Sequence, residues 1–127
     1  MEYKYKKELT LPYAEAVEKV KDELGKEGFG ILTEIDVRET LKNKLDVDMD
    51  PYVILGACNP PNAHRSLQAE QDIGLMLPCN VIVYEKDKKT YVSAILPTVA
   101  MGMIENADLK DVAHLIEAKL KKAMDAV

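Results

Sequence analysis

The chain is poor in the residues that proteins use to recognise nucleic acids. Its 127 residues include no tryptophan and one phenylalanine, so no obvious aromatic platform is present on which bases could stack. Only two arginines occur, Arg38 and Arg65, although arginine is the usual reader of phosphates and base edges. The net charge of −5 also opposes binding to a polyanion. A nucleic-acid partner is therefore not expected.

Apolar targeting segments are missing as well. The first residues, 1–7, are charged and contain no apolar stretch typical of a signal peptide. No run approaches the length of about 20 apolar residues that a membrane-spanning helix needs. We therefore expect a cytoplasmic protein without a membrane partner. In that compartment thiols stay reduced, which disfavours a structural disulfide.

The familiar motifs of enzymes are also lacking. No G-x-S-x-G pattern surrounds Ser66 or Ser93. The glycines at 25, 28 and 30 have neither the spacing nor the following lysine of a phosphate-binding loop. The carboxylates are numerous but scattered. We predict no cofactor and favour a non-catalytic function over an enzymatic one.

Composition and periodicity predict one α+β domain spanning residues 1–127. The hydrophobic content of 47% and the charged content of 31% are ordinary for a globular protein, and the length suffices for one core. The expected strands are residues 2–10, 29–37, 52–58, 80–84 and 90–96. The expected helices are about 12–24, 37–45 and 60–69, and a last helix capped by Asp108, with an apolar loop at 98–104. This β-α-β-α-β-α-β-β-α order favours helices packed on a mostly antiparallel sheet.

Two cysteines, each within two residues of a proline, are the most informative feature. Cys58 ends the expected third strand and precedes Asn59, Pro60 and Pro61, and Cys79 follows Pro78 at the start of the fourth strand. If those strand ends adjoin, the two sulfur atoms come close. The simplest interpretation is that both thiols pack as small apolar groups.

Three chemical alternatives remain open for this corner. One is redox or sulfur-transfer chemistry, in which Cys58 or Cys79 is the nucleophile and the other resolves it; no C-x-x-C pair supports it. A second is a structural metal site with His64 and Asp72, although the spacing matches no compact zinc motif. A third is an anion site at the start of the helix after Asn59, with His64 and Arg65 nearby. There the prolines remove two N–H donors, which favours a simple capped helix.

The segment 52–60, with Ala63, Leu67, Gly74 and residues 77–81, resembles domain-of-unknown-function family 302, a small bacterial and archaeal family. Features at 24–29, 34–36 and 83–85 agree, so the resemblance covers essentially the whole chain. It implies a compact α+β domain with TATA-box-binding-protein-like topology, commonly a homodimer, and no implication of DNA binding. It implies no settled activity. The family's motif corresponds here to a shared site or structural corner made by Cys58, Asn59, Pro60, Leu77, Pro78 and Cys79.

We therefore predict a homodimeric, non-catalytic module that binds a small ligand or a protein partner at this corner. Cys58, Asn59, Pro60, Pro78 and Cys79 would form the pocket, and His64 and Arg65 would be its polar contacts. The sheet face and the loop 101–104 would supply the contact between subunits.

Overall fold

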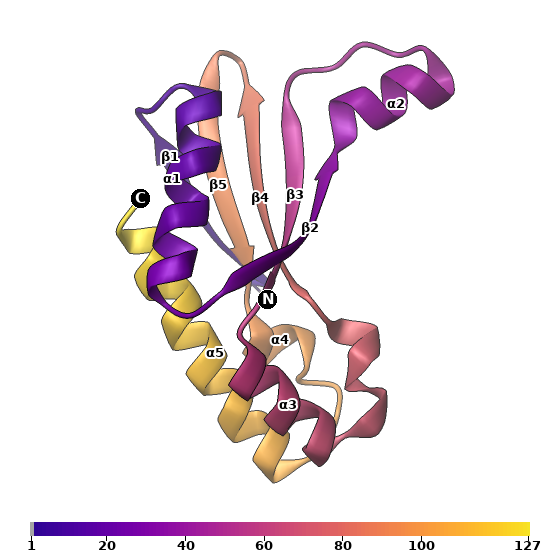
Figure 1. Ribbon diagram of the computed structural model, residues 1–127, viewed down its shortest axis with the longest axis vertical. Helices are drawn as coiled ribbons and strands as arrows, with labels where there is room; N and C mark the ends of the chain where they lie inside the picture. Colours follow the sequence, from indigo (N-terminus) through magenta and orange to yellow (C-terminus); the bar gives the residue numbers. More distant parts are fainter. Residues whose placement is uncertain (1) are drawn as a thin grey trace.

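An antiparallel sheet of five strands organises the computed structural model, which describes residues 2–127 (Figure 1). The strands are β1 (Lys4–Leu9), β2 (Gly30–Asp36), β3 (Tyr52–Cys58), β4 (Cys79–Lys86) and β5 (Lys89–Ile95). Their spatial order is β1-β5-β4-β3-β2, and every neighbouring pair is antiparallel. The predicted fold class and the predicted order of the main elements are both confirmed.

Period-two alternation decides which side of the sheet is buried. In the central strand β4, Cys79, Val81 and Val83 are buried, whereas the side chains between them are more exposed. β4 and β5 are joined through Asp87 and Lys88, both of which have positive φ values (53° and 67°). A two-residue turn of this kind matches the twist of the flanking strands.

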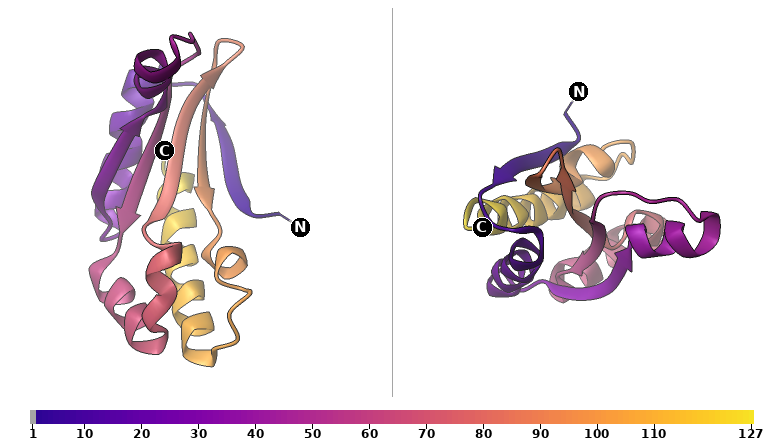
Figure 2. Two further views of the ribbon diagram at one scale, coloured as in Figure 1. Left: turned by 90° about the vertical axis from the view of Figure 1, so that its right-hand side faces the viewer. Right: turned by 90° about the horizontal axis from the view of Figure 1, so that it is seen from above.

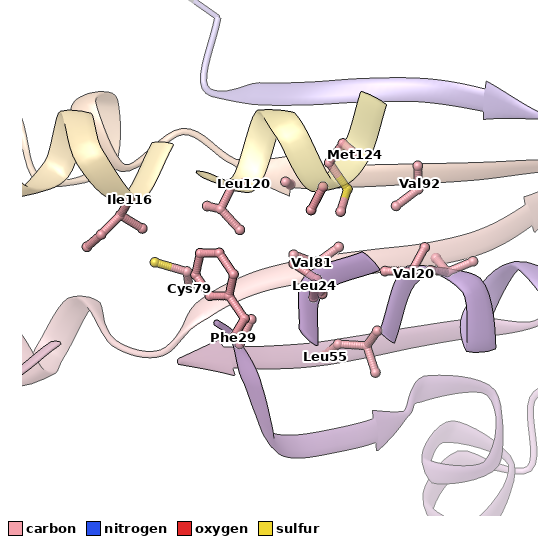
Figure 3. Close-up of a cluster of buried hydrophobic side chains, with 14 of the residues drawn as sticks. Val20, Leu24, Phe29, Leu55, Cys79, Val81, Val92, Ile116, Leu120 and Met124 are labelled. Carbon is pink, nitrogen blue, oxygen red and sulfur yellow. The ribbon is translucent and has the colours of Figure 1, made fainter. Parts of the chain in front are cut away.

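Two long helices, α1 (Tyr13–Lys26) and α5 (Ala107–Asp125), cover one face of the sheet. Seen from above, they lie side by side on that face (Figure 2). Their apolar stripes meet the buried strand residues in one continuous core (Figure 3). Its largest fully buried side chains are Leu24, Leu55, Ile73, Leu109, Leu120, Met124, Val20, Val81, Val83, Val92 and Val112. Within residues 2–127, the opposite side of the sheet, called the open face below, carries no such pair of long helices (Figure 2).

Short helices close the end of the sheet at which β3 ends and β4 begins. They are α3 (Pro60–Ala69), the 3-10 helix η1 (Gln71–Met76) and α4 (Pro97–Ala100), and α5 runs down beside them (Figure 1). The sequence interpretation missed η1 and placed α4 in a loop, because elements of one or two turns are too short to show a hydrophobic period. It also took Asp108 as the cap of α5, but the side chain that accepts the Leu109 N–H is that of Asn106, at 3.0 Å.

Helix α2 (Val37–Leu45) has the bounds that the sequence predicted. Its first turn is fixed locally, because the Asp36 carboxylate accepts the Glu39 N–H at 2.9 Å. No residue of α2 is buried, and the helix projects from the body of the molecule (Figures 1 and 2). Among the helices of residues 2–127, none is long and apolar enough to cross a membrane.

Candidate functional site

The register between β3 and β4 brings the two cysteine-bearing strand ends together. Ala57 pairs with Cys79, so Cys58 lies one residue beyond the paired position. The predicted meeting of the two strand ends is therefore present. Beside them, a Cβ built on Gly56 would lie 2.1 Å from Thr33 Oγ1 and 2.7 Å from Pro78 Cγ. Only glycine lets Pro78 enter β4 this close to β3.

A pocket of about 280 Å³ opens at this junction and is called the cysteine pocket below. Strands β2 and β3, the entry to β4 and helices α3 and α5 all contribute to its walls. Figure 3 shows Cys79, Phe29 and Ile116 together at this end of the core. The pocket is lined by Phe29, Leu32, Ala57, Cys58, Asn59, Ala63, Leu67, Leu77, Pro78, Cys79 and Ile116.

Asn59 is the single amide in the lining, and its polar atoms already have partners. Its Nδ2 donates to the Glu27 carbonyl oxygen at 3.2 Å, and its Oδ1 accepts from Asn62 Nδ2 at 3.1 Å. Gly28 approaches the same amide with a φ of 84°, and a Cβ there would lie 3.1 Å from Nδ2. Asn59 therefore joins the end of α1 to the start of α3. It contributes to the shape of the pocket more than to its polarity.

The structure brings together four of the residues that the sequence nominated: Cys58, Asn59, Pro78 and Cys79 all line the pocket. Pro60, His64 and Arg65 do not belong to the lining. Helical spacing explains the difference, since the positions of α3 that face the pocket are Ala63 and Leu67, four residues apart.

The two nominated polar contacts face elsewhere. His64 is exposed. The Arg65 guanidinium binds the Asp108 carboxylate, with Nε 3.2 Å from Oδ1, and so ties α3 to α5. The sequence interpretation missed Phe29, Leu32 and Ile116, which come from distant parts of the chain. Ala63 and Leu67 were present in the motif that carried the family resemblance, but without an assigned role.

The electrostatic environment keeps the buried thiol protonated. Burial, and next the neighbouring Cys58, raise the pKa of Cys79 from 9.0 to about 11. A thiol in this state is a poor nucleophile at neutral pH, because the thiolate is the reactive form. Both cysteines are free. The environment of Cys79 thus suits contact with an apolar group.

A metal site finds no support in the part of the chain that the structure describes. No group of three or more His, Cys, Asp and Glu side chains is arranged there to hold a metal ion. His64 and Asp72, the extra ligands considered from the sequence, are both exposed. The geometry therefore favours neither the metal site nor the thiol-exchange alternative.

Residues 5–127 match the family model described as domain of unknown function DUF302. The chain belongs to this family. It is also similar to a solved DUF302 relative, the uncharacterized conserved protein DUF302 from Bacillus stearothermophilus, at 33% sequence identity. The match covers 99% of this chain and 98% of that chain with a TM-score of 0.93, so the two DUF302 proteins share one fold throughout. No curated protein matches the chain.

Proposed function

We propose that this DUF302 protein binds a small apolar ligand in the cysteine pocket, without covalent chemistry. The observation that carries the proposal is the composition of the lining, in which carbon and sulfur dominate and the Asn59 amide is already hydrogen-bonded. Burial of apolar ligand surface would supply the binding free energy, about 25 cal/mol per Å². At about 280 Å³, the pocket lies near the lower end of ligand sites, which suits a small occupant.

The two thiols act in this proposal as polarisable wall groups. Cys79 stays neutral because its pKa is raised to about 11, so it presents a soft, weakly polar surface to the ligand. The role requires reduced cysteines, which is consistent with a cytoplasmic location.

Toluene is a suitable probe, because it is apolar and small. The experiment is a titration of the reduced protein with toluene, followed through the methyl resonances of the lining residues Ala63, Leu67 and Ile116. Saturable shifts confined to residues of the pocket lining are expected. Ala63→Leu should fill the pocket and abolish them, while Ala118→Leu, an exposed position on α5 outside the lining, should bind as the unaltered protein does.

Two results would oppose this function. One is the absence of saturable shifts in the unaltered protein; the other is unchanged binding by Ala63→Leu. Native mass spectrometry of freshly purified protein complements the titration, because an excess mass would identify a retained occupant.

We also propose that a second copy of the chain covers the open face of the sheet. Tyr52, Tyr84 and Tyr91 stack across three strands, with ring centroids 5.4 and 5.3 Å apart. Lys6 lies over two of these rings, with Nζ 4.7 Å from the Tyr91 centroid, and Ile35 is 46% exposed. An uncovered aromatic and aliphatic surface of this kind is typical of a protein interface. Met103, 75% exposed in the loop before α5, would add to the contact.

A further inference from the structure

A second pocket, of about 600 Å³, lies between the α4–α5 connection and the first turns of α5. It is called the α4–α5 pocket below. None of its lining residues belongs to the cysteine pocket, so the two can be tested separately. The lining consists of Thr98, Met101, Gly102, Ile104, Glu105, Asn106, Ala107, Lys110, Ala113 and His114.

Specific contacts hold the two walls of this pocket in place. At one end, the Glu117 carboxylate of α5 accepts hydrogen bonds from the Thr98 backbone N–H at 3.1 Å and from Thr98 Oγ1 at 2.6 Å. At the other end, Asn106 Oδ1 caps α5, and Asn106 Nδ2 donates to the Ala69 carbonyl at 2.8 Å. Helix α4 is thus fixed to α5, and the start of α5 is fixed to the end of α3. The pocket is therefore preformed, as ligand sites usually are.

The connection also turns tightly beside the pocket. A Cβ built on Gly102 would lie 2.8 Å from the Thr98 carbonyl oxygen and 3.2 Å from that of Val99. A larger residue would push the connection away from α4. The glycine therefore contributes to the shape of the cavity as well as to the turn.

The lining combines an apolar base with two charges of opposite sign. Met101 and Ala113 are buried and form the apolar part. Glu105 comes from the connection and Lys110 from the helix, and both are exposed. The salt bridges of α5 side chains use Asp108, Glu117, Lys121 and Lys122. Within residues 2–127, Glu105 and Lys110 thus remain without an ion-pair partner.

We infer that the α4–α5 pocket binds an α-amino acid with an apolar side chain. Glu105 would accept the ammonium group, Lys110 would bind the carboxylate, and Met101 and Ala113 would contact the side chain. His114 lines the pocket one helical turn after Lys110, so it is placed to donate a second hydrogen bond to the carboxylate. A ligand with one charge would leave either Glu105 or Lys110 without a partner. Because charge-assisted hydrogen bonds are stronger than neutral ones, such a ligand should bind more weakly than an amino acid.

Calorimetric titration with L-leucine tests this inference. Saturable binding is expected for the unaltered protein, with NMR shifts at Met101 and Ala113. The singly charged analogues 4-methylpentanoate and 3-methylbutylamine should each bind about tenfold more weakly. Glu105→Gln and Lys110→Gln should each weaken L-leucine binding about tenfold. The matched control Lys119→Gln, on the same helix but outside the lining, should leave it unchanged.

Both altered side chains are exposed, so the variants keep the fold, and far-ultraviolet circular dichroism checks this. The inference is overturned if the unaltered protein fails to bind L-leucine at millimolar concentration. It is also overturned if both variants bind as tightly as the control, or if the shifts map to the cysteine pocket. Toluene binding in the cysteine pocket is independent of all these outcomes.

Discussion

At the residue scale, Gly56 shows how closely three chain segments approach one another beside the cysteine pocket. The Thr33 hydroxyl on β2 and the Pro78 ring at the entry to β4 occupy the space that a side chain on β3 would need. From the sequence alone, Gly56 resembles any glycine within a strand. Only the packing of neighbouring segments reveals why a larger residue does not fit.

Gly56→Ala should lower the free energy of unfolding by roughly 1–3 kcal/mol, because the added methyl group overpacks the junction. Gly30→Ala is the matched control. Gly30 lies on the neighbouring strand, and a Cβ there meets nothing within 4 Å, so its effect should stay within about 0.5 kcal/mol. Urea unfolding measures both values. Equal stability of the two variants would contradict the account of the junction.

Cys79 makes the stability of the fold depend on alkaline pH. The folded protein raises the pKa of this thiol from 9.0 to about 11, so the neutral thiol is favoured in the folded state. The neutral Cys79 thiol makes its full contribution to the unfolding free energy below pH 9.0, the pKa of this thiol in the unfolded chain. That contribution is lost as the pH rises through the pKa of the thiol in the folded protein. The unfolding free energy of the unaltered protein, relative to Cys79→Ala, should therefore fall between about pH 9 and 11, by at most about 3 kcal/mol. A difference that stays constant over this range would contradict the buried, neutral thiol.

At the scale of elements, the start of α5 is decided by a tertiary contact. Asn106 and Asp108 are both good capping residues, and the local sequence does not separate them. Asn106 also donates to the Ala69 carbonyl at 2.8 Å, which fixes the helix start beside α3. Asp108 instead binds Arg65 on the surface.

Asn106→Ala should destabilise the protein by about 1–2 kcal/mol, because the Leu109 N–H loses its acceptor and the Ala69 carbonyl loses its donor. Asp108→Ala should cost less than about 1 kcal/mol, since it removes only an exposed ion pair with Arg65, which contributes little. Thermal unfolding of the two variants side by side gives the comparison. If Asp108→Ala were the more damaging change, the result would favour Asp108, the cap predicted from the sequence, over Asn106.

The sequence predicted some helices and strands accurately and missed others, depending on whether the element carries a local signal such as a cap or a hydrophobic period. Helix α2 was predicted with its correct bounds, because its cap lies within its own first turn at Asp36 and Glu39. The strands followed from alternation. The helices η1 and α4 are too short to show a period.

The residues of the cysteine pocket likewise fall into those that the sequence predicted and those that it did not. Cys58, Asn59, Pro78 and Cys79 were found because they adjoin one another along two strand ends. Phe29 and Ile116 reach the pocket only through the packing of helices and strands far apart in sequence.

At the scale of the whole molecule, the long helices of residues 2–127 lie on one face of the sheet only. α1 and α5 bury that face (Figure 2), and the open face keeps its stacked tyrosines and isoleucines accessible. The central strand β4 places Ile82 in the middle of the open face, paired with Ile54 and Ser93. A charge introduced there would have to be buried in any contact made through this surface.

Sedimentation equilibrium should show a dimer for the unaltered protein. Ile82→Lys should raise the dissociation constant about 100-fold or more, because an unpaired charge would be buried at the centre of the interface. Leu75→Lys is the control, at a residue of η1 that is 87% exposed, and should leave the dimer intact. A monomeric unaltered protein, or equal dissociation of both variants, would exclude the open face as the subunit contact.

The pairing of β1 with β5 also bears on how the chain folds during synthesis. Lys4 pairs with Ile95, and Lys7 Nζ donates to the Val127 carbonyl at 2.8 Å, so the first strand depends on the last third of the chain. During synthesis on the ribosome, β1 has no strand to pair with until β5 has left the ribosomal exit tunnel. Joining segments so far apart requires closing a long loop, which slows folding. The first strand therefore stays without a pairing strand while residues 10–88 are made, and the sheet gains this edge only after β5 has formed.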